Sequence, residues 1–518
     1  MTNEPQGVRA LKSPGLVLAR NAMYNFFTQV VVSVVAFASL PIIVRGLGDE
    51  AFGILALLWM VVGYFSILDF GVGQASIKFL AEHIGRGEND GANATVWASV
   101  AVSGGLGLLT GAAILLLGRP LLDTFVSIPV ALRDETLDSF SLVAIAVPFV
   151  MVQGAFRAVP MAVQRFDLFN LMLGLSGLLQ WGGSLVLVVR GAGLVEVVML
   201  TVAIRVVGAG VACGIAVRLF PGLSFRIPSG VRPAARKLLN FGGWFTVSQV
   251  VSPVARYLDR LFVVSYHSLK TFTSYAAPFE AMSRLQVIPL SLSTTLYPAM
   301  SERETVRGKA NSYSLFMRAI NFTILLMLPM TLVLVAFSRP ILDLWLGGDF
   351  PILSNDAFRI LAAAAFIQAV CYVPLTALQA LGRPDAAAKY YLAEIPLYAG
   401  LCLLLIPPLG IVGAAWAYCI RMALSTLWLL RAAYRALGSP TIAPRPLVRA
   451  LILNLIFLMI LLILAAVTVF SAGLVIALGF IAVGYFAVVW LWCMDHTEKE
   501  VVRQLLAARF HWNARTRG

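Results

Sequence analysis

The stretch NAMYNFFTQVVVSVVAFASLPIIV, residues 21–44, decides the fold because it carries no charged side chain from end to end. A helix of about 20 apolar residues crosses a hydrocarbon core about 30 Å thick. The run is too long for the apolar core of a cleavable signal peptide and lacks a small-residue cleavage site. We therefore interpret it as an uncleaved membrane span.

Similar runs recur along the whole chain of 518 residues, which is 60% apolar and only 12% charged. Soluble domains carry about 25% charged residues, so the composition predicts an all-α polytopic membrane protein. We expect about fourteen transmembrane helices, at residues 21–44, 51–77, 94–117, 139–160, 168–189, 195–217, 239–265, 272–298, 313–337, 357–380, 391–408, 411–431, 447–469 and 473–494.

The basic residues fix the expected orientation, because positive charge in short loops stays on the cytoplasmic side. With the N-terminus inside, only seven of the 39 Lys and Arg fall in the outer loops or at the outer end of a span: Arg45, Arg119, Arg133, Arg190, Lys270, Arg339 and Arg359. An even number of spans then places both termini in the cytoplasm. The net charge of +14 is spread between the apolar runs and forms no patch with interleaved aromatics, so we expect no nucleic-acid partner.

An internal repeat divides the spans into two sets of six. Parallel repeats of this kind are a recurring transporter design, with a central site between the halves. The repeat rests on four matches at or near an offset of 220 residues: RPLLD (119–123) with RPILD (339–343), TQVV (28–31) with SQVV (248–251), Glu82 with Glu302, and VPMAVQ (159–164) with VPLTALQ (373–379).

The repeat and the charge pattern together predict seven segments. They are a cytoplasmic N-terminal segment (1–20), an N-terminal six-helix bundle (21–217), a basic cytoplasmic linker (218–238), a C-terminal six-helix bundle (239–431), a second cytoplasmic linker (432–446), two additional transmembrane helices (447–494) and a cytoplasmic tail (495–518).

Motifs of catalysis are absent from the sequence. It holds no GxSxG, Walker A or HExxH motif, and its five cysteines form no CxxC pair. The longest outer loop, residues 118–138, is too short for a substantial extracytoplasmic domain. We therefore expect a protein that is not an enzyme and that needs no cofactor or metal.

Charged residues inside the spans are the main candidates for function, because their burial in lipid is costly. Arg205, Arg284 and Arg421 fall about 15–18 Å from the outer ends of their helices, close to the middle of the membrane. The planar guanidinium of arginine donates two parallel hydrogen bonds, which suits phosphate. We expect these three arginines to line a cationic cavity that binds an anionic, phosphorylated substrate.

Other intramembrane charges have two interpretations. Glu280 lies one turn from Arg284, and Arg256, Asp259 and Arg260 share one face of their helix. These groups either form intrahelical salt bridges or contribute to the cavity. Arg256 and Arg260 are thus further candidates for substrate binding.

Four acidic residues are candidates for ion coupling or gating: Asp69, Asp259, Glu280 and Glu394. Asp69, in SILDFGVGQ (66–74), lies about 27 Å along its span and so near the cytoplasmic face. We favour a structural role for it, in which it caps the helix or contacts Lys78. The alternative is a place at the mouth of the substrate path.

The stretch LPIIVRGLGDEAFGILALLWMVVGYFSILDFGVGQASIKFLAE (40–82) resembles the opening of Wzx-type O-antigen and exopolysaccharide flippases of the multidrug/oligosaccharidyl-lipid/polysaccharide exporter superfamily. The similarity rests on an LG-x-x-x-(F/Y)-G turn and a later D-x-G. It extends over about 20–435 and includes YLDRLFVVSY (257–266), Tyr275 and LYPAMSE (296–302).

The resemblance implies two pseudo-symmetric six-helix bundles around a central cavity, as in MATE-type transporters. It also implies that oligosaccharides on polyprenyl pyrophosphate cross from the cytoplasmic to the periplasmic leaflet of a bacterial inner membrane. The same resemblance implies transport by alternating access and a coupling ion (H⁺ or Na⁺). It also implies two kinds of partner, membrane lipid and the polysaccharide polymerase machinery.

Three alternatives stay open. A lipid II flippase, which delivers a peptidoglycan precursor, is compatible with the two additional helices. A multidrug exporter would favour an acidic cavity for its cationic substrates. A membrane glycan polymerase or ligase ranks last, because its large outer domain is missing from the sequence.

Overall fold

The computed structural model describes residues 14–67, 72–220, 231–241, 257–293, 309–438, 452–461 without 458, and 472–493, with a few single residues between these ranges. Every regular element in these ranges is a helix. Eight of the described helices are long and apolar enough to cross a membrane. The protein is therefore an all-α multi-pass membrane protein, as the composition predicts.

In the first half of the chain, the predicted spans 21–44, 94–117, 139–160 and 195–217 each lie within one helix, whereas the span 51–77 includes residues outside the described ranges. Helix α8 begins with Gly193, whose backbone N–H donates to Glu196 Oε2 at 2.9 Å and so closes the first turn. The elements are α1 (Pro14–Leu47), α2 (Asp49–Ile67), α3 (Val72–Gly85), α4 (Asn89–Phe125), η1 (Val130–Leu132), α5 (Arg133–Ala162), α6 (Phe166–Leu178), η2 (Leu179–Gly183), α7 (Ser184–Val189), α8 (Leu194–Leu219) and α9 (Val231–Phe241).

The connection at residues 118–138, which the charge pattern predicts to face outward, differs from the expected loop. Helix α4 continues to Phe125, and α5 already begins at Arg133. Arg133 Nη2 donates to Asp123 Oδ1 at 2.8 Å and links the two helix ends. The connection is therefore mostly helical, which leaves even less room for an outer domain than the sequence suggests.

The second half contains helical residues 257–266 and 287–293 and the elements α11 (Leu269–Arg284), α13 (Lys309–Ala336), α14 (Ser338–Trp345), α15 (Phe350–Leu353), α16 (Asn355–Ala380) and α17 (Pro384–Leu437). Helix α11 begins at Ser268, whose hydroxyl accepts the N–H of Thr271. The predicted span 272–298 is not one helix, because a turn at Leu285 and Gln286 interrupts it.

Helix α17 is a hairpin of two antiparallel arms that hold the predicted spans 391–408 and 411–431. Gly410 lies at the bend with φ +58° and ψ −135°, a backbone conformation that favours glycine. The arms contact each other far from this bend, where Ser425 Oγ lies 3.1 Å from the hydroxyl of Tyr390.

The repeat has a structural counterpart on both sides of the molecule. RPLLD (119–123) ends α4, the helix before α5, and RPILD (339–343) lies in α14, just before α15 and α16. VPMAVQ and VPLTALQ lie at the ends of α5 and α16. The matches at 248–251 and Glu302 lie outside the described residues.

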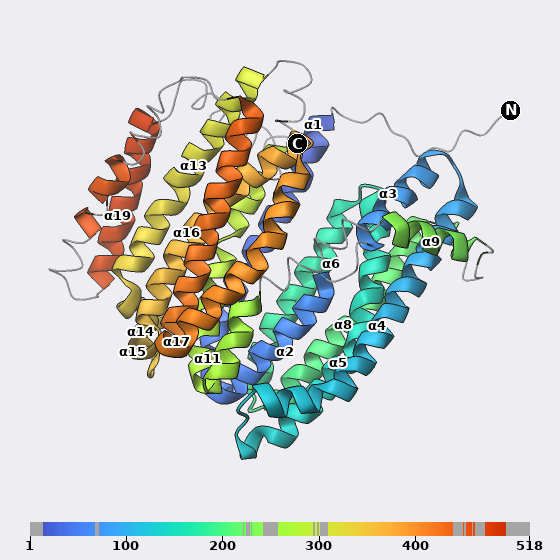
Figure 1. Ribbon diagram of the computed structural model, residues 1–518, viewed down its shortest axis with the longest axis horizontal. Helices are drawn as coiled ribbons and strands as arrows, with labels where there is room; N and C mark the ends of the chain where they lie inside the picture. Colours follow the sequence, from blue (N-terminus) through green and yellow to red (C-terminus); the bar gives the residue numbers. More distant parts are fainter. Residues whose placement is uncertain are drawn as a thin grey trace, which may run out of the picture.

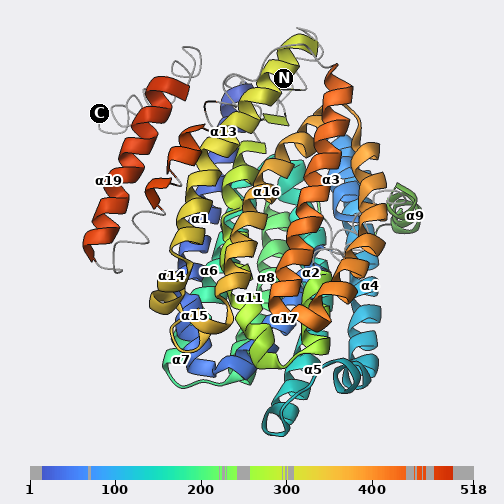
Figure 2. The same ribbon diagram turned by 60° about the vertical axis from the view of Figure 1, so that its left-hand side comes forward.

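The two bundles lie side by side and approach each other at the end that carries α14 and α15, at the bottom of Figures 1 and 2. The main contact between them joins α2 to α11. Beyond the second bundle, residues 452–461, α19 (Ala472–Val488) and η3 (Val489–Cys493) pack against α13 through Phe457 and Tyr485. The total of fourteen helices stays a prediction, since several predicted spans include residues outside the described ranges.

Candidate functional site: a cationic cavity between the bundles

Two glycines of the LG-x-x-x-(F/Y)-G turn close one end of the molecule, which the charge pattern predicts to be the outer end. Gly48 has φ +84°, and this left-handed conformation turns the chain from α1 into α2. A Cβ on Gly53 would lie 2.8 Å from Thr273 Oγ1 and 3.0 Å from the carbonyl oxygen of Leu269. Glycine at position 53 thus allows α2 to pack directly against α11.

Polar and aromatic contacts across the same boundary reinforce this closure. Thr273 Oγ1 donates to the carbonyl oxygen of Asp49 at 2.5 Å, and Arg45 Nε donates to that of Leu346 at 2.9 Å. The rings of Phe37 and Trp345 stack with centroids 4.5 Å apart. The two bundles are therefore joined at the end that the charge pattern predicts to face outward.

Two adjoining chambers lie between the bundles above this closure. One chamber of about 430 Å³ is lined by α1, α2, α5, α6, α8 and α11, and one of about 550 Å³ lies between α11, α16 and α17. Both have walls from Gln29, Tyr257, Arg260, Glu280 and Arg284. These shared residues show that the two chambers adjoin, and we refer to them together as the central cavity.

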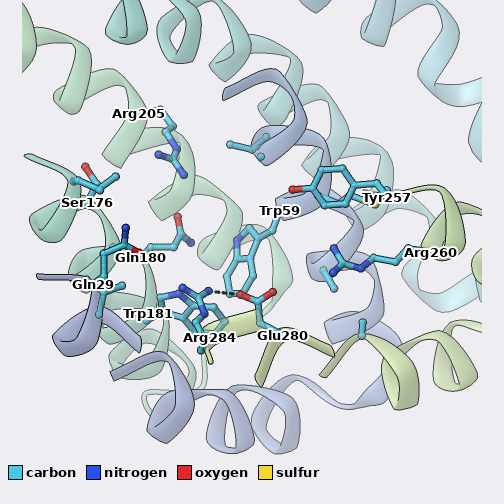
Figure 3. A pocket seen from close by; sticks show the side chains of 18 of the residues that line it. Gln29, Trp59, Ser176, Gln180, Trp181, Arg205, Tyr257, Arg260, Glu280 and Arg284 are labelled. Atoms are coloured by element: carbon cyan, nitrogen blue, oxygen red, sulfur yellow. Dashed lines mark hydrogen bonds and ion pairs between the residues drawn. The ribbon is translucent and has the colours of Figure 1, made fainter. Parts of the chain in front are cut away.

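The charged residues that line the cavity are five arginines and two glutamates: Arg157, Arg205, Arg260, Arg284, Arg421, Glu280 and Glu394. The cavity therefore carries a formal charge of +3, from five cations minus two anions. Figure 3 shows Arg205, Arg260 and Arg284 on different walls of the first chamber. An anion in this chamber can thus be contacted from several sides.

Arg157 and Arg205 are the cations with the fewest protein partners. Nε and Nη2 of Arg157 and Nε of Arg205 are buried without a hydrogen-bond acceptor. Neither guanidinium forms an ion pair with a residue in the described part of the chain. Buried donors that lack acceptors are costly, so these two arginines are poised to bind an anion.

Arg284 and Glu280 form the intrahelical ion pair that their spacing predicts, and both still line the cavity. Arg284 Nη2 donates to Glu280 Oε1, as drawn in Figure 3. The guanidinium lies 5.2 Å from the ring centroid of Trp181. The two interpretations of this pair therefore do not exclude each other.

Arg260 packs against aromatic rings and forms no ion pair within the described part of the chain. Its guanidinium carbon lies 4.0 Å from the ring centroid of Phe279 and 5.2 Å from that of Tyr257. Cation–π contacts of this kind stabilise a cation without neutralising its charge. Arg260 thus keeps its full charge for the cavity.

Arg421 has a partner that local sequence spacing does not reveal. Its Nε donates to Glu394 Oε1 at 2.7 Å across the α17 hairpin, and Ser425 Oγ donates to the same oxygen at 2.8 Å. The side chains of Arg421 and Glu394 are only 10% and 1% exposed. Both line the second chamber, but the pair is electrically neutral.

Asp259 is fully buried and does not line the cavity. Its Oδ2 accepts a hydrogen bond from the hydroxyl of Tyr275 at 2.5 Å, and its Oδ1 has no partner. The candidates Asp69 and Arg256 lie outside the described residues. Their predicted roles therefore stay predictions.

Sequence reasoning missed Arg157 and the turn that carries Gln180 and Trp181. Arg157 lies three residues before the predicted inner end of its span, where a basic residue fits the loop pattern, yet its side chain lines the cavity. Residues Leu179–Gly183 form a π-helical turn, a feature common at functional sites. No motif in LQWGG signals such a turn.

Gln180 and the tryptophans give the first chamber a polar and aromatic wall. Gln180 Nε2 and Trp59 Nε1 donate to Thr201 Oγ1 at 2.8 and 3.3 Å. Gln180 Oε1 is buried without a donor. Together with the arginines, this wall can bind a ligand that has an anionic group and many hydroxyl groups.

Nothing in the described part of the chain resembles a metal centre, since no group of three His, Cys, Asp or Glu side chains comes together there.

The sequence profile of the family described as polysaccharide biosynthesis protein matches residues 18–304. The chain belongs to this family. The match includes four of the five cavity arginines.

The relatives and structural neighbours of this family member agree with its fold. A Shigella flexneri protein described as a candidate O-antigen transporter is 27% identical over 419 residues, which cover 80% of this chain and 96% of that protein. An inward-facing MATE-family multidrug resistance transporter of the MOP superfamily superposes with a TM-score of 0.68 at 15% identity, over 80% of this chain and 98% of that one.

The lipid II flippase MurJ in an inward closed conformation also superposes with a TM-score of 0.68, at 12% identity. The superposition includes 92% of this chain and the full length of the MurJ chain. At these identities the structures show a common fold, the two-bundle architecture of this superfamily, and nothing further about substrate.

Proposed function

We propose that the protein is a flippase that moves oligosaccharides linked to polyprenyl pyrophosphate from the cytoplasmic to the periplasmic leaflet, for the synthesis of O-antigen or exopolysaccharide. Transport needs no covalent step, so the proposal assigns no catalytic residue. The family and the Shigella flexneri relative described as a candidate O-antigen transporter support the substrate class.

The observation that carries the proposal is the excess of arginine in the central cavity. Arg157 and Arg205 have buried donors without acceptors, and a pyrophosphate offers several acceptor oxygens to such donors. Arg260 and Arg284 extend the cationic wall toward the second bundle. A cavity for cationic drugs would require the opposite charge balance.

The remaining lining residues suit the sugars of such a substrate. Gln29 and Gln180 are uncharged amides that line the first chamber. An amide both donates and accepts hydrogen bonds, as hydroxyl groups require of a partner. Trp59 and Trp181 meet edge to face, with ring centroids 4.8 Å apart. They add apolar surface beside these polar groups.

With the predicted outer end closed, the proposed transport cycle starts with loading from the cytoplasm. Alternating access then requires the α2–α11 contact to open and the bundles to approach each other on the other side. An inside-negative potential assists export of an anion by about 2.3 kcal/mol per charge per 100 mV. The same proposal includes a coupling ion (H⁺ or Na⁺). Its candidate sites are the acids Asp69, Asp259, Glu280 and Glu394.

The proposed location is the bacterial inner membrane, with both termini in the cytoplasm and with polysaccharide polymerase machinery as a partner. A second candidate function, export of lipid II, rests on the two additional helices expected at residues 447–494. The chain shares its fold with the lipid II flippase MurJ and with the MATE-type transporter, so the fold does not decide between these functions.

Complementation separates these functions. A bacterium that lacks its own O-antigen flippase receives the wild type, Arg157→Ala, Arg284→Ala or Arg421→Ala at matched membrane abundance. Arg165→Ala is the control, because Arg165 is exposed, pairs with Asp167 and lies outside the cavity. We expect surface polysaccharide with the wild type and the control, and its loss in the cavity variants.

Two other results redirect the proposal. Restoration by every variant would contradict the role of the arginines and leave the flippase function standing. Failure of the wild type, together with rescue of a strain depleted of its lipid II flippase, would establish the second candidate function.

A further inference from the structure

A groove on the outer surface of the α17 hairpin is separate from the central cavity. It has a volume of about 1050 Å³ and lies between the two arms, with walls from Tyr390, Leu397, Leu424, Leu427, Trp428, Leu430, Arg431, Tyr434, Arg435 and Gly438. None of these residues lines the central cavity. Helix α17 runs along the front of the molecule in Figure 2.

The apolar wall of the groove is open to the surroundings. Leu397, Leu427 and Trp428 are 47%, 64% and 52% exposed. The opposite side of the same helical arm is covered, because Leu429, Ala433 and Leu437 are buried in the cluster that includes Phe457 and Tyr485. In a membrane-spanning hairpin, the open side faces lipid.

Two arginines close one end of this apolar groove. Arg431 and Arg435 lie one helical turn apart near the C-terminal end of α17, where like charges repel each other. Neither has an acidic partner in the described part of the chain. An anion between the two guanidinium groups would remove the repulsion and satisfy their donors.

The aromatic side of the groove is held in place from within. The rings of Tyr390 and Trp428 pack with centroids 5.7 Å apart. The hydroxyl of Tyr390 is hydrogen-bonded to Ser425, which in turn contacts Glu394. Aromatic residues of this kind gather at the boundary between the acyl chains and the head groups.

We propose that this groove binds an anionic phospholipid, with its phosphate between Arg431 and Arg435 and an acyl chain along Leu397, Leu427 and Trp428. Both arginines lie on the face that the charge pattern predicts to be cytoplasmic, where anionic lipids attract basic residues. The α17 hairpin separates the groove from the cavity, so the lipid is not the transported substrate. The inference holds whatever that substrate is.

Native mass spectrometry of the purified full-length protein tests the site. The probes are phosphatidylglycerol and the zwitterionic phosphatidylethanolamine. The variant is Arg431→Gln/Arg435→Gln. The matched control is Arg232→Gln/Arg236→Gln, an exposed basic pair with the same spacing on α9. It lines neither this groove nor the pocket beside α9.

We expect one phosphatidylglycerol molecule to remain bound to the wild type and to the control. The Arg431→Gln/Arg435→Gln variant should bind it about 30-fold more weakly, because each arginine near a membrane surface contributes about fivefold to the affinity for an anionic lipid. Quenching of tryptophan fluorescence by brominated phosphatidylglycerol should decrease in Trp428→Phe, which locates the acyl chain. Thermal unfolding of each variant checks that the fold is kept.

Three results would overturn the inference. One is equal retention of phosphatidylglycerol by the variant and the control. Another is equal retention of the zwitterionic lipid, which would show an apolar groove without a phosphate site. The third is displacement of phosphatidylglycerol by a polyprenyl phosphate at lower concentration, which would assign the groove to the chain of the substrate.

Discussion

Arg421 Nε donates to Glu394 Oε1 at 2.7 Å, although the two residues are 27 positions apart and nearly buried. The bend at Gly410 brings them together on the two arms of α17. The guanidinium also lies 4.7 Å from the ring centroid of Tyr398. A buried ion pair therefore fastens one arm of the hairpin to the other beside the cavity.

Breaking this pair on one side should destabilise the protein strongly. Glu394→Ala or Arg421→Ala leaves an uncompensated buried charge, which costs about 3–5 kcal/mol, whereas the double variant should lose less than the sum of the two. Thermal unfolding in detergent measures the coupling. The exposed pair Arg133–Asp123 is the control and should contribute at most about 1 kcal/mol. If the double variant loses as much stability as the two single variants together, the two side chains do not stabilise each other.

Gly53→Ala should open the outer end. The added Cβ would lie 2.8 Å from Thr273 Oγ1, a distance that forces α2 and α11 apart. A cysteine introduced at Ala56, on the cavity wall, should then react faster with a membrane-impermeant thiol reagent applied from outside. The control is Gly105→Ala, since a Cβ at Gly105 meets nothing within 4 Å. Equal reaction rates in the two variants would show that the close packing at Gly53 is not what keeps the end shut.

Arg157→Gln and Arg205→Gln should each weaken binding of a short prenyl pyrophosphate by about 10-fold to 150-fold, because a hydrogen bond to a charged group contributes about 1.5–3 kcal/mol. Isothermal titration calorimetry on the purified protein measures this loss. Arg165→Gln, outside the cavity, should bind as the wild type does. Unchanged affinity in both cavity variants would remove these arginines from the site.

The pair between Lys270 and Asp349 should give stability that depends on pH. Lys270 Nζ lies 2.7 Å from Asp349 Oδ2, and this hydrogen bond, with the charge attraction, lowers the pKa of Asp349 below its usual 3.8. A lowered pKa stabilises the folded state above pH 3.8 and ceases to do so as the pH falls through the folded-state value.

Melting temperatures of the wild type and Lys270→Gln should therefore differ at neutral pH and converge in strong acid. The same bond raises the pKa of Lys270, so its contribution is also lost in strong alkali. The melting temperature of Asp349→Asn should depend on pH in the same way as that of Lys270→Gln. The melting temperature of the double variant should equal that of either single variant. A constant difference at every pH would show that the ion pair is not its source.

Much of the fold was predictable because apolar length alone determines where a chain can cross a bilayer. The predicted span 195–217 lies within α8, and 357–380 lies within α16. Interruptions were harder to predict. The turn at Leu285 and Gln286 breaks a run whose hydrophobicity continues, so no change of composition indicates it.

The site was predictable where the evidence is local. Arg205 and Arg284 line the cavity, as their depth along the helix suggests, and the i,i+4 spacing of Glu280 and Arg284 gave their ion pair. The contact between Glu394 and Arg421 depends on how two helices face each other, which sequence spacing does not encode. Arg157 was missed because a basic residue near the inner end of a span resembles an ordinary loop charge.

The π-helical turn at Leu179–Gly183 adds one residue to a helix that otherwise has α-helical spacing. An added residue rotates everything beyond it by about 100°, and Gln180 and Trp181 are the side chains that it presents to the cavity. Gain or loss of a single residue here would therefore change which side chains face the cavity. The same change would turn α7, whose Ser184 and Val188 are buried, so the length of this helix links the cavity wall to the packing behind it.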